Sequence, residues 1–87
     1  MPYIDAKTRN ILDHPLHELG SVVPGFSIGV LNYVVVKLCL KWLKNRGRDY
    51  ETLNAVVGML ECVKLEMFRR VVAPYEDGRC GENGDVF

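Results

Sequence analysis

The sequence predicts an all-α fold: a small three-helix domain with a C-terminal turn and tail, packed as a homo-oligomer. Apolar residues recur at helical spacing in three segments, about residues 4–20, 28–46 and 50–72, and turn-forming residues separate these segments. The 87 residues suffice for a single helical domain, residues 1–87, which would bury only about 60% of its unfolded surface. Oligomerisation is the expected source of further burial.

The first predicted helix covers about residues 4–20. Its apolar positions follow a broken helical pattern: Ile4, Ile11, Leu12, Leu16 and Leu19. Pro15 interrupts this pattern and Gly20 closes it, because proline removes a helical hydrogen bond and glycine commonly follows a helix end. Pro24-Gly25 then forms a turn, and Ser27 is a candidate cap for the next helix.

The second predicted helix, residues 28–46, is apolar around most of its circumference. A narrow basic strip remains: Lys37, Lys41, Lys44 and Arg48, at spacings of four, three and four residues, which lie on one face if the helix extends to Arg48. The run of three valines from Val34 favours a strand, but the leucine-rich residues after it and the helical period of the strip favour a helix. So wide an apolar surface needs partners on two sides, which predicts contact with a second subunit.

Gly47 ends this helix, and Asp49 followed by Thr52 begins the third one, at about residues 50–72. This helix has the clearest apolar stripe of the chain: Leu53, Val56, Val57, Leu60, Val63, Met67 and Val71. Its other face carries the small residues Ala55, Gly58 and Cys62, a surface for either a close helix contact or solvent. Glu66 and Arg70 are spaced for an ion pair.

Pro74 is expected to stop or kink the third helix, so that residues 74–87 form a turn and a tail. The tail carries four acidic residues and one basic residue: Glu76, Asp77, Glu82, Asp85 and Arg79. It either frays or docks on the basic strip of its own or a neighbouring subunit, and its apolar end and the turn at Asn83-Gly84 favour docking.

The overall composition excludes several classes of protein. Eleven basic and eleven acidic residues give a formal net charge of zero, which argues against general nucleic-acid binding. No segment has the pattern of a signal peptide or the length of a membrane span, so a cytoplasmic protein without membrane partners is expected. Three cysteines without CxxC spacing argue against a disulfide framework or a zinc site, and Cys39 and Cys62 are expected to be buried.

No catalytic set is evident, so no catalytic residue, metal or cofactor is assigned. His14 and His17 share a helix face, but Pro15 lies between them and no third ligand follows, which favours solvated histidines. Glu61 and Glu66 lie five residues apart and therefore on different helix faces. The sequence has no phosphate loop, no Ser-His-Asp set and no glycine-rich nucleotide motif.

Three segments resemble a family of small uncharacterised bacterial and bacteriophage helical proteins: LNYVV from Leu31, NAVVGMLECVKLEMFRRVVAPYED from Asn54 and NGDVF from Asn83. The resemblance covers about two thirds of the chain and rests on polar residues, which implies a site or a demanding interface. The residues that it suggests for ligand binding are Asn32, Tyr33, Asn54, Glu61, Lys64, Arg69, Arg70, Tyr75 and Asp77.

These side chains suit a nucleotide, because amides read base edges, aromatic rings stack and cations bind phosphate. The leading hypothesis is a non-catalytic homo-oligomer that sequesters a small anionic, nucleotide-like ligand at a subunit interface, by analogy with small phage proteins of other families that sequester nucleotide signals of host defence. The alternative is a protein-interaction module that binds a host or phage protein. A third hypothesis is a metal-dependent hydrolase that uses Glu61 or Glu66.

Overall fold

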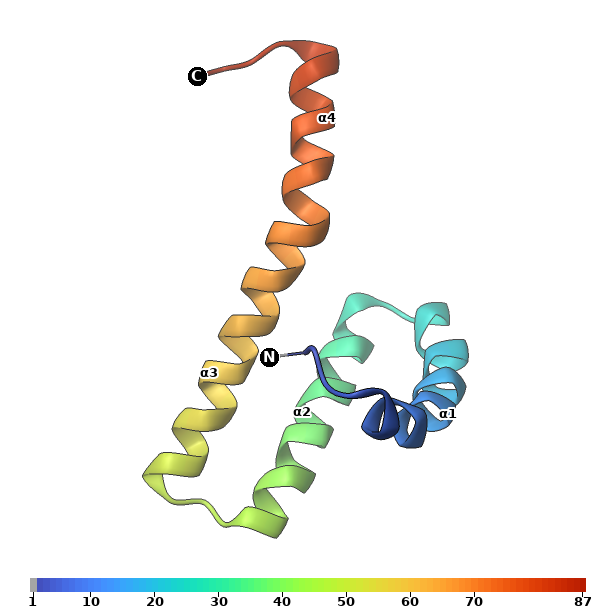
Figure 1. The fold of residues 1–87 in the computed structure, drawn as a ribbon, viewed down its shortest axis with the longest axis vertical. Coiled ribbons are helices and arrows are strands. Elements are labelled where there is room, and N and C mark those ends of the chain that lie inside the picture. The colour runs from blue at the N-terminus through green and yellow to red at the C-terminus, as the bar shows by residue number, and fades with distance from the viewer. Residues whose placement is uncertain (1) are drawn as a thin grey trace. The chain divides into compact units, whose positions relative to one another are not determined.

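The computed structural model describes residues 2–87, which are helical from Ala6 to Asn83 except at short connections (Figure 1). The elements are α1 (Ala6–Val22), the 3₁₀ turn η1 (Val23–Gly25), α2 (Ile28–Arg46), α3 (Tyr50–Met67), the π-helical segment η2 (Phe68–Val72) and α4 (Ala73–Asn83). No strand occurs in residues 2–87, so the all-α prediction is confirmed. The chain divides into two units, Met1–Asn54 and Ala55–Phe87.

Helix α1 starts at a side-chain cap and continues through its proline. The Asp5 carboxylate accepts a hydrogen bond from the Thr8 N–H at 2.7 Å. The predicted interruption at Pro15 and end at Gly20 are wrong, because the helix runs to Val22. Pro15 lacks only the bond to the carbonyl of Ile11, a residue 69% exposed, so that water can take the place of the missing donor.

Helix α2 has the predicted bounds, and Gly47 ends it as expected. The backbone of Gly47 has φ +91°, and its N–H donates to the carbonyl oxygen of Leu43 at 2.7 Å. Side chains strongly disfavour this backbone conformation, which explains glycine at the position. Ser27 occupies the N-terminal cap position with an extended backbone, but its side chain makes no capping hydrogen bond.

Replacing Gly47 by alanine is expected to destabilise the protein by about 1 kcal/mol, because a Cβ is strained at this positive φ. Gly20 is the matched control: it lies within α1, and a Cβ there would meet nothing within 4 Å. Gly20→Ala is expected to stabilise the protein by roughly 0.5–1 kcal/mol. Urea denaturation followed by circular dichroism measures both changes, and equal effects of the two variants would contradict the role of Gly47.

Helix α3 begins at the predicted Asp49–Thr52 cap. The Thr52 N–H donates to the Asp49 carboxylate at 2.8 Å, and the Thr52 hydroxyl donates to the carbonyl oxygen of Gly47 at 2.7 Å. The hydrogen bonds from the Thr52 backbone and side chain lower the pKa of Asp49 below its usual value of 3.8. The cap therefore ties the start of α3 to the end of α2.

The stability that the Asp49 cap contributes is expected to depend on pH. Because the folded-state pKa is depressed, this contribution is complete above the unfolded pKa near 3.8 and is lost as the pH falls through the folded value. In the variant Asp49→Asn, the side-chain amide oxygen accepts the same hydrogen bond but does not titrate. The stability difference between wild type and Asp49→Asn, measured from pH 6 to pH 2, should shrink with falling pH; a constant difference would contradict this role.

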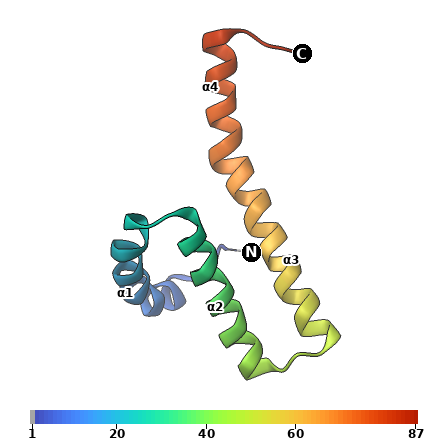
Figure 2. The same ribbon diagram turned by 180° about the vertical axis from the view of Figure 1, so that it is seen from behind.

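The third helix does not end at Val72, and the predicted turn and tail are wrong up to Asn83. Residues 50–83 are continuously helical because η2 connects α3 to α4 without a break (Figure 2). The Ala73 N–H donates to the carbonyl oxygen of Phe68, five residues back, so the backbone widens before Pro74. Pro74 then lies in the first turn of α4, where its missing N–H costs little. Gly84, at φ +90°, ends the helix after Asn83.

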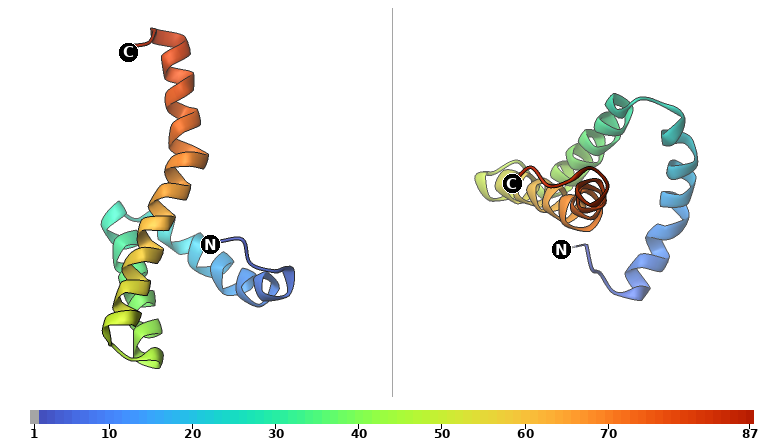
Figure 3. Two further views of the ribbon diagram at one scale, coloured as in Figure 1. Left: turned by 60° about the vertical axis from the view of Figure 1, so that its left-hand side comes forward. Right: turned by 90° about the horizontal axis from the view of Figure 1, so that it is seen from above.

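Side-chain burial is sparse within residues 2–87. Leu43, 6% exposed, is the one buried hydrophobic residue that the described chain contains. In the first unit, η1 joins α1 and α2 at one end, and the two helices diverge from there (Figure 3). The helices thus present apolar side chains that they do not cover by packing on each other.

Candidate interface and binding site

An apolar groove lies where α1, η1 and α2 meet in the first unit. Its volume is about 520 Å³, and it is lined almost entirely by apolar side chains. The lining consists of Leu16, Leu19, Gly20, Val23, Pro24, Phe26, Ser27, Ile28, Leu31, Val34, Val35 and Leu38. Several of these side chains remain open to solvent, such as Ile28 at 80% and Phe26 at 61%. An apolar surface of this kind is typical of a site that another protein segment covers.

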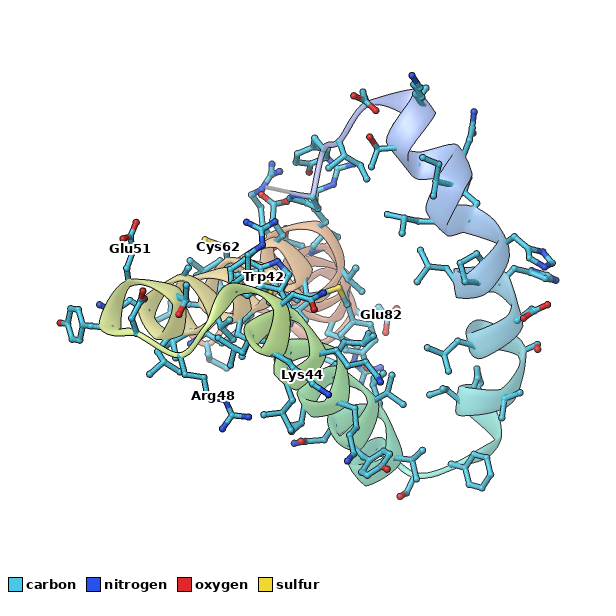
Figure 4. All side chains as sticks on the ribbon, turned by 90° about the horizontal axis from the view of Figure 1, so that it is seen from below. Trp42, Lys44, Arg48, Glu51, Cys62 and Glu82 are labelled. Carbon is cyan, nitrogen blue, oxygen red and sulfur yellow. The ribbon has the colours of Figure 1, made fainter. Side chains whose placement is uncertain are left out.

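The basic strip occupies the opposite end of α2 and the connection after it, because α2 ends at Arg46 and Arg48 lies beyond the helix. Lys37, Lys41, Lys44 and Arg48 line a shallow groove of about 400 Å³ together with Leu40, Leu43 and Gly47. Figure 4 shows Lys44 and Arg48 on one side of the helix and Trp42 on the other. None of the four cations forms an ion pair with a carboxylate in residues 2–87, although the Lys37 ammonium lies 5.5 Å from the centre of the Tyr33 ring. The strip is therefore an uncompensated positive surface.

The second unit carries the predicted apolar stripe along one helix. Leu60, Val63, Met67 and Val71 are 37–54% exposed and follow each other at spacings of three and four residues. Residues 55–83 form a single continuous helix, and one helix cannot bury its own stripe. The unit contains no other helix against which this stripe could pack.

Three of the four charged candidate residues on α3 and η2 are engaged in ion pairs along the helix. The Lys64 ammonium lies 3.0 Å from the Glu61 carboxylate, and the Arg69 guanidinium lies 3.1 Å from the Glu66 carboxylate. The structure thus forms the Glu66–Arg69 pair in place of the expected Glu66–Arg70 pair. Within the described residues Arg70 makes no ion pair, so its guanidinium is available for another anion.

The nine candidate ligand-binding residues are distributed over both units. Asn32, Tyr33 and Asn54 belong to the first unit, and the other six belong to the second: Glu61, Lys64, Arg69, Arg70, Tyr75 and Asp77. All nine side chains are exposed, and Tyr75, at 67%, lies on α4 and not in the predicted turn. Two members of the set, Glu61 and Lys64, contact each other directly through an ion pair.

Histidine and cysteine side chains form no metal site in the part of the chain that the structure covers. His14 lies 3.0 Å from the Glu18 carboxylate, an exposed pair one helical turn apart. No group of three potential metal ligands occurs among residues 2–87. Cys39 is half-buried, but the expected burial of Cys62 is wrong, since Cys62 and Cys80 are exposed in this chain. The three thiols are free.

Among the described residues, no helix is both long enough and apolar enough to cross a bilayer.

The residues that line the apolar groove were not among the nine candidate ligand-binding residues predicted from the sequence. Leu19, Phe26 and Ile28 surround a turn, where apolar side chains are not expected to face solvent. Phe26 between Gly25 and Ser27 is the signal that could have indicated this surface, because a large aromatic residue in a polar turn favours an interface.

Comparisons with known proteins assign a family but not an activity. Neither the curated proteins nor the solved structures contain a significant match to this sequence. One family model matches residues 1–86, nearly the whole chain, and its description is Domain of unknown function (DUF6899). The chain therefore belongs to the DUF6899 family, an uncharacterised domain family, in agreement with the resemblance to uncharacterised helical proteins.

Proposed function

We propose that this chain is a non-catalytic binding protein that assembles with copies of itself and holds a small anionic, nucleotide-like ligand at the subunit interface. The observation that carries the proposal is the scarcity of burial: Leu43 alone is buried in residues 2–87, whereas the groove and the stripe expose large apolar side chains. A chain with so small a core gains stability mainly from contacts with other molecules.

The exposed apolar residues of the long helix support contact between copies. Residues 50–83 form a continuous helix of about 50 Å. Phe68, Val71 and Tyr75 lie in its C-terminal part and are 52–67% exposed, and the second unit contains no other helix that could cover them. A second copy supplies apolar surface of the same kind.

The anionic ligand is proposed from the polar residues of the second unit. Arg70 makes no ion pair in the described chain, Lys64 is held one turn away from Glu61, and Tyr75 presents an exposed ring. A guanidinium and an ammonium bind phosphate oxygens, and a tyrosine ring stacks on a base. In an assembly, Asn32 and Asn54 of the first unit would supply amides for the base edge.

A protein partner is the second candidate, and the uncompensated basic strip favours it. Four cations beside the exposed Leu40 fit an acidic amphipathic helix of another protein as well as they fit a helix of this chain. The two candidates differ in one observable property, the mass of the assembled particle.

Native mass spectrometry of gently purified protein tests the proposal. We expect a multiple of the 9.9 kDa chain mass, with a few hundred additional daltons for each bound ligand. An oligomer without added mass would support self-assembly but contradict the bound ligand, and would favour a protein partner instead. A bare monomer at micromolar concentration would overturn it.

A further inference from the structure

The two units carry opposite charge in the segments that lack ion-pair partners. Residues 28–48 contain five basic residues and no acidic one. In residues 73–87 the charge is reversed, with four acidic residues and one basic residue. The single basic residue, Arg79, pairs with Glu82 at 3.3 Å, whereas Glu76 and Asp77 form no ion pair within residues 2–87. Each unit therefore has an unpaired charged surface that the other complements.

Apolar and charged surfaces follow each other in the same order along both helices. On α2 the apolar groove residues run from Ile28 to Leu38, and Lys41 and Lys44 of the basic strip follow them, with Lys44 about 24 Å from Ile28. On the long helix the apolar stripe from Leu60 to Val71 precedes the acidic residues, and Leu60 and Glu76 are about 24 Å apart. The two surfaces match in length and in order when the helices run parallel.

We propose that the acidic helix α4 of one copy lies parallel to α2 of a second copy and contacts its basic strip, while the apolar stripe of the same helix occupies the second copy's groove. The exchange is reciprocal, so that each copy gives one helix and receives one, which closes a two-fold dimer. This inference rests on the proposed self-assembly and identifies the segments that pair, with the acidic end docked on a neighbouring copy.

Charge reversal tests the pairing. Lys41→Glu with Lys44→Glu reverses the strip, and Glu76→Lys with Asp77→Lys reverses α4. Each double variant alone is expected to weaken dimerisation at least roughly tenfold, because like charges replace opposite ones in both copies of the contact. In an equal mixture of the two variants, both contacts of the mixed dimer regain opposite charges, and its dissociation constant should return to within about threefold of wild type.

The matched control is Lys7→Glu with Arg9→Glu, which makes the same change in charge on α1, outside the strip and the groove. Sedimentation velocity at low ionic strength gives the dissociation constants, and circular dichroism verifies that each variant keeps its helix content. A dimer that persists unchanged in both strip and α4 variants, or two variants whose mixture remains dissociated, would overturn the inference.

Cross-linking adds a direct distance measurement on the wild-type chain. Cys80 is exposed on α4, one turn after Glu76, and a short thiol–amine reagent should join it to Lys41 or Lys44 of the partner copy. In an equal mixture of ¹⁵N-labelled and unlabelled protein, about half of the linked peptide pairs should combine the two isotopes. Links confined to one isotope would place the contact within one chain and contradict the inference.

These outcomes separate the inference from the proposed function. A wild-type monomer would refute self-assembly and with it both proposals. A wild-type oligomer that is indifferent to charge reversal and gives no mixed-isotope link would leave self-assembly intact and refute only the parallel pairing of α4 with α2.

Discussion

Replacing Leu31 by aspartate is expected to convert the assembled protein into monomers. Leu31 lines the apolar groove of the first unit and is 45% exposed in the single chain, so a partner helix would cover it. An uncompensated charge buried in an interface costs about 3–5 kcal/mol, which weakens association by more than roughly 100-fold. Sedimentation velocity at micromolar concentration measures the shift from oligomer to monomer.

The control for Leu31→Asp is Asn10→Asp, which adds the same charge to α1 at an exposed position outside the groove. This variant should keep the wild-type oligomer at every concentration tested. If Leu31→Asp also keeps it, the groove is not an interface between copies, and the exposed apolar side chains there require another occupant.

Loss of the bound anion is the second large effect expected, from Lys64→Ala and from Arg70→Ala. A hydrogen bond between a cation and a phosphate contributes about 1.5–3 kcal/mol, so each variant should weaken nucleotide binding by roughly 10- to 100-fold. ATP is the probe, titrated against the oligomer by isothermal calorimetry. The ligand mass retained in native mass spectra provides an independent measurement on protein purified from cells.

Arg79→Ala is the matched control for the ligand prediction. It removes one cation from the same continuous helix, but Arg79 already pairs with Glu82 and lies outside the candidate set. The oligomer mass should be unchanged in all three variants, since the ion pairs of Lys64 and Arg79 are exposed and Arg70 makes none in residues 2–87. Dissociation of Lys64→Ala or Arg70→Ala would show that these residues hold subunits together, and equal affinity in all variants would exclude them from an anion site.

Helix ends were predictable wherever one residue determines them locally. Gly47 adopts a positive φ that other residues disfavour, and the Asp49 carboxylate bonds the Thr52 N–H three residues later, so the end of α2 and the start of α3 follow from short motifs. Helix continuity at Pro74 was not predictable in this way. It depends on a backbone bond from Ala73 to Phe68, which shifts the helical register before the proline is reached.

The candidate site was predictable in part for a related reason. Periodicity identified the apolar stripe and the basic strip, because both lie on single helices. The groove depends on how α1 and α2 diverge from the turn around Phe26, which residue spacing within one helix does not encode. The prediction that Cys62 is buried was wrong, because helix periodicity shows which residues are apolar or small but not whether another segment of the same chain packs on them.

The π-helical segment Phe68–Val72 makes the number of residues there a functional quantity. Because a π turn holds one more residue than an α turn, deleting one residue from this segment would restore a regular helix and leave Tyr75 and Glu76 facing nearly the same direction relative to Met67. Deleting one residue from the regular α-helix before it would instead rotate everything beyond the deletion by about 100°, although no side chain of either surface had changed. The segment should therefore accept the loss of one codon more readily than the regular turns before it, where such a loss would uncouple two surfaces that must engage a partner together.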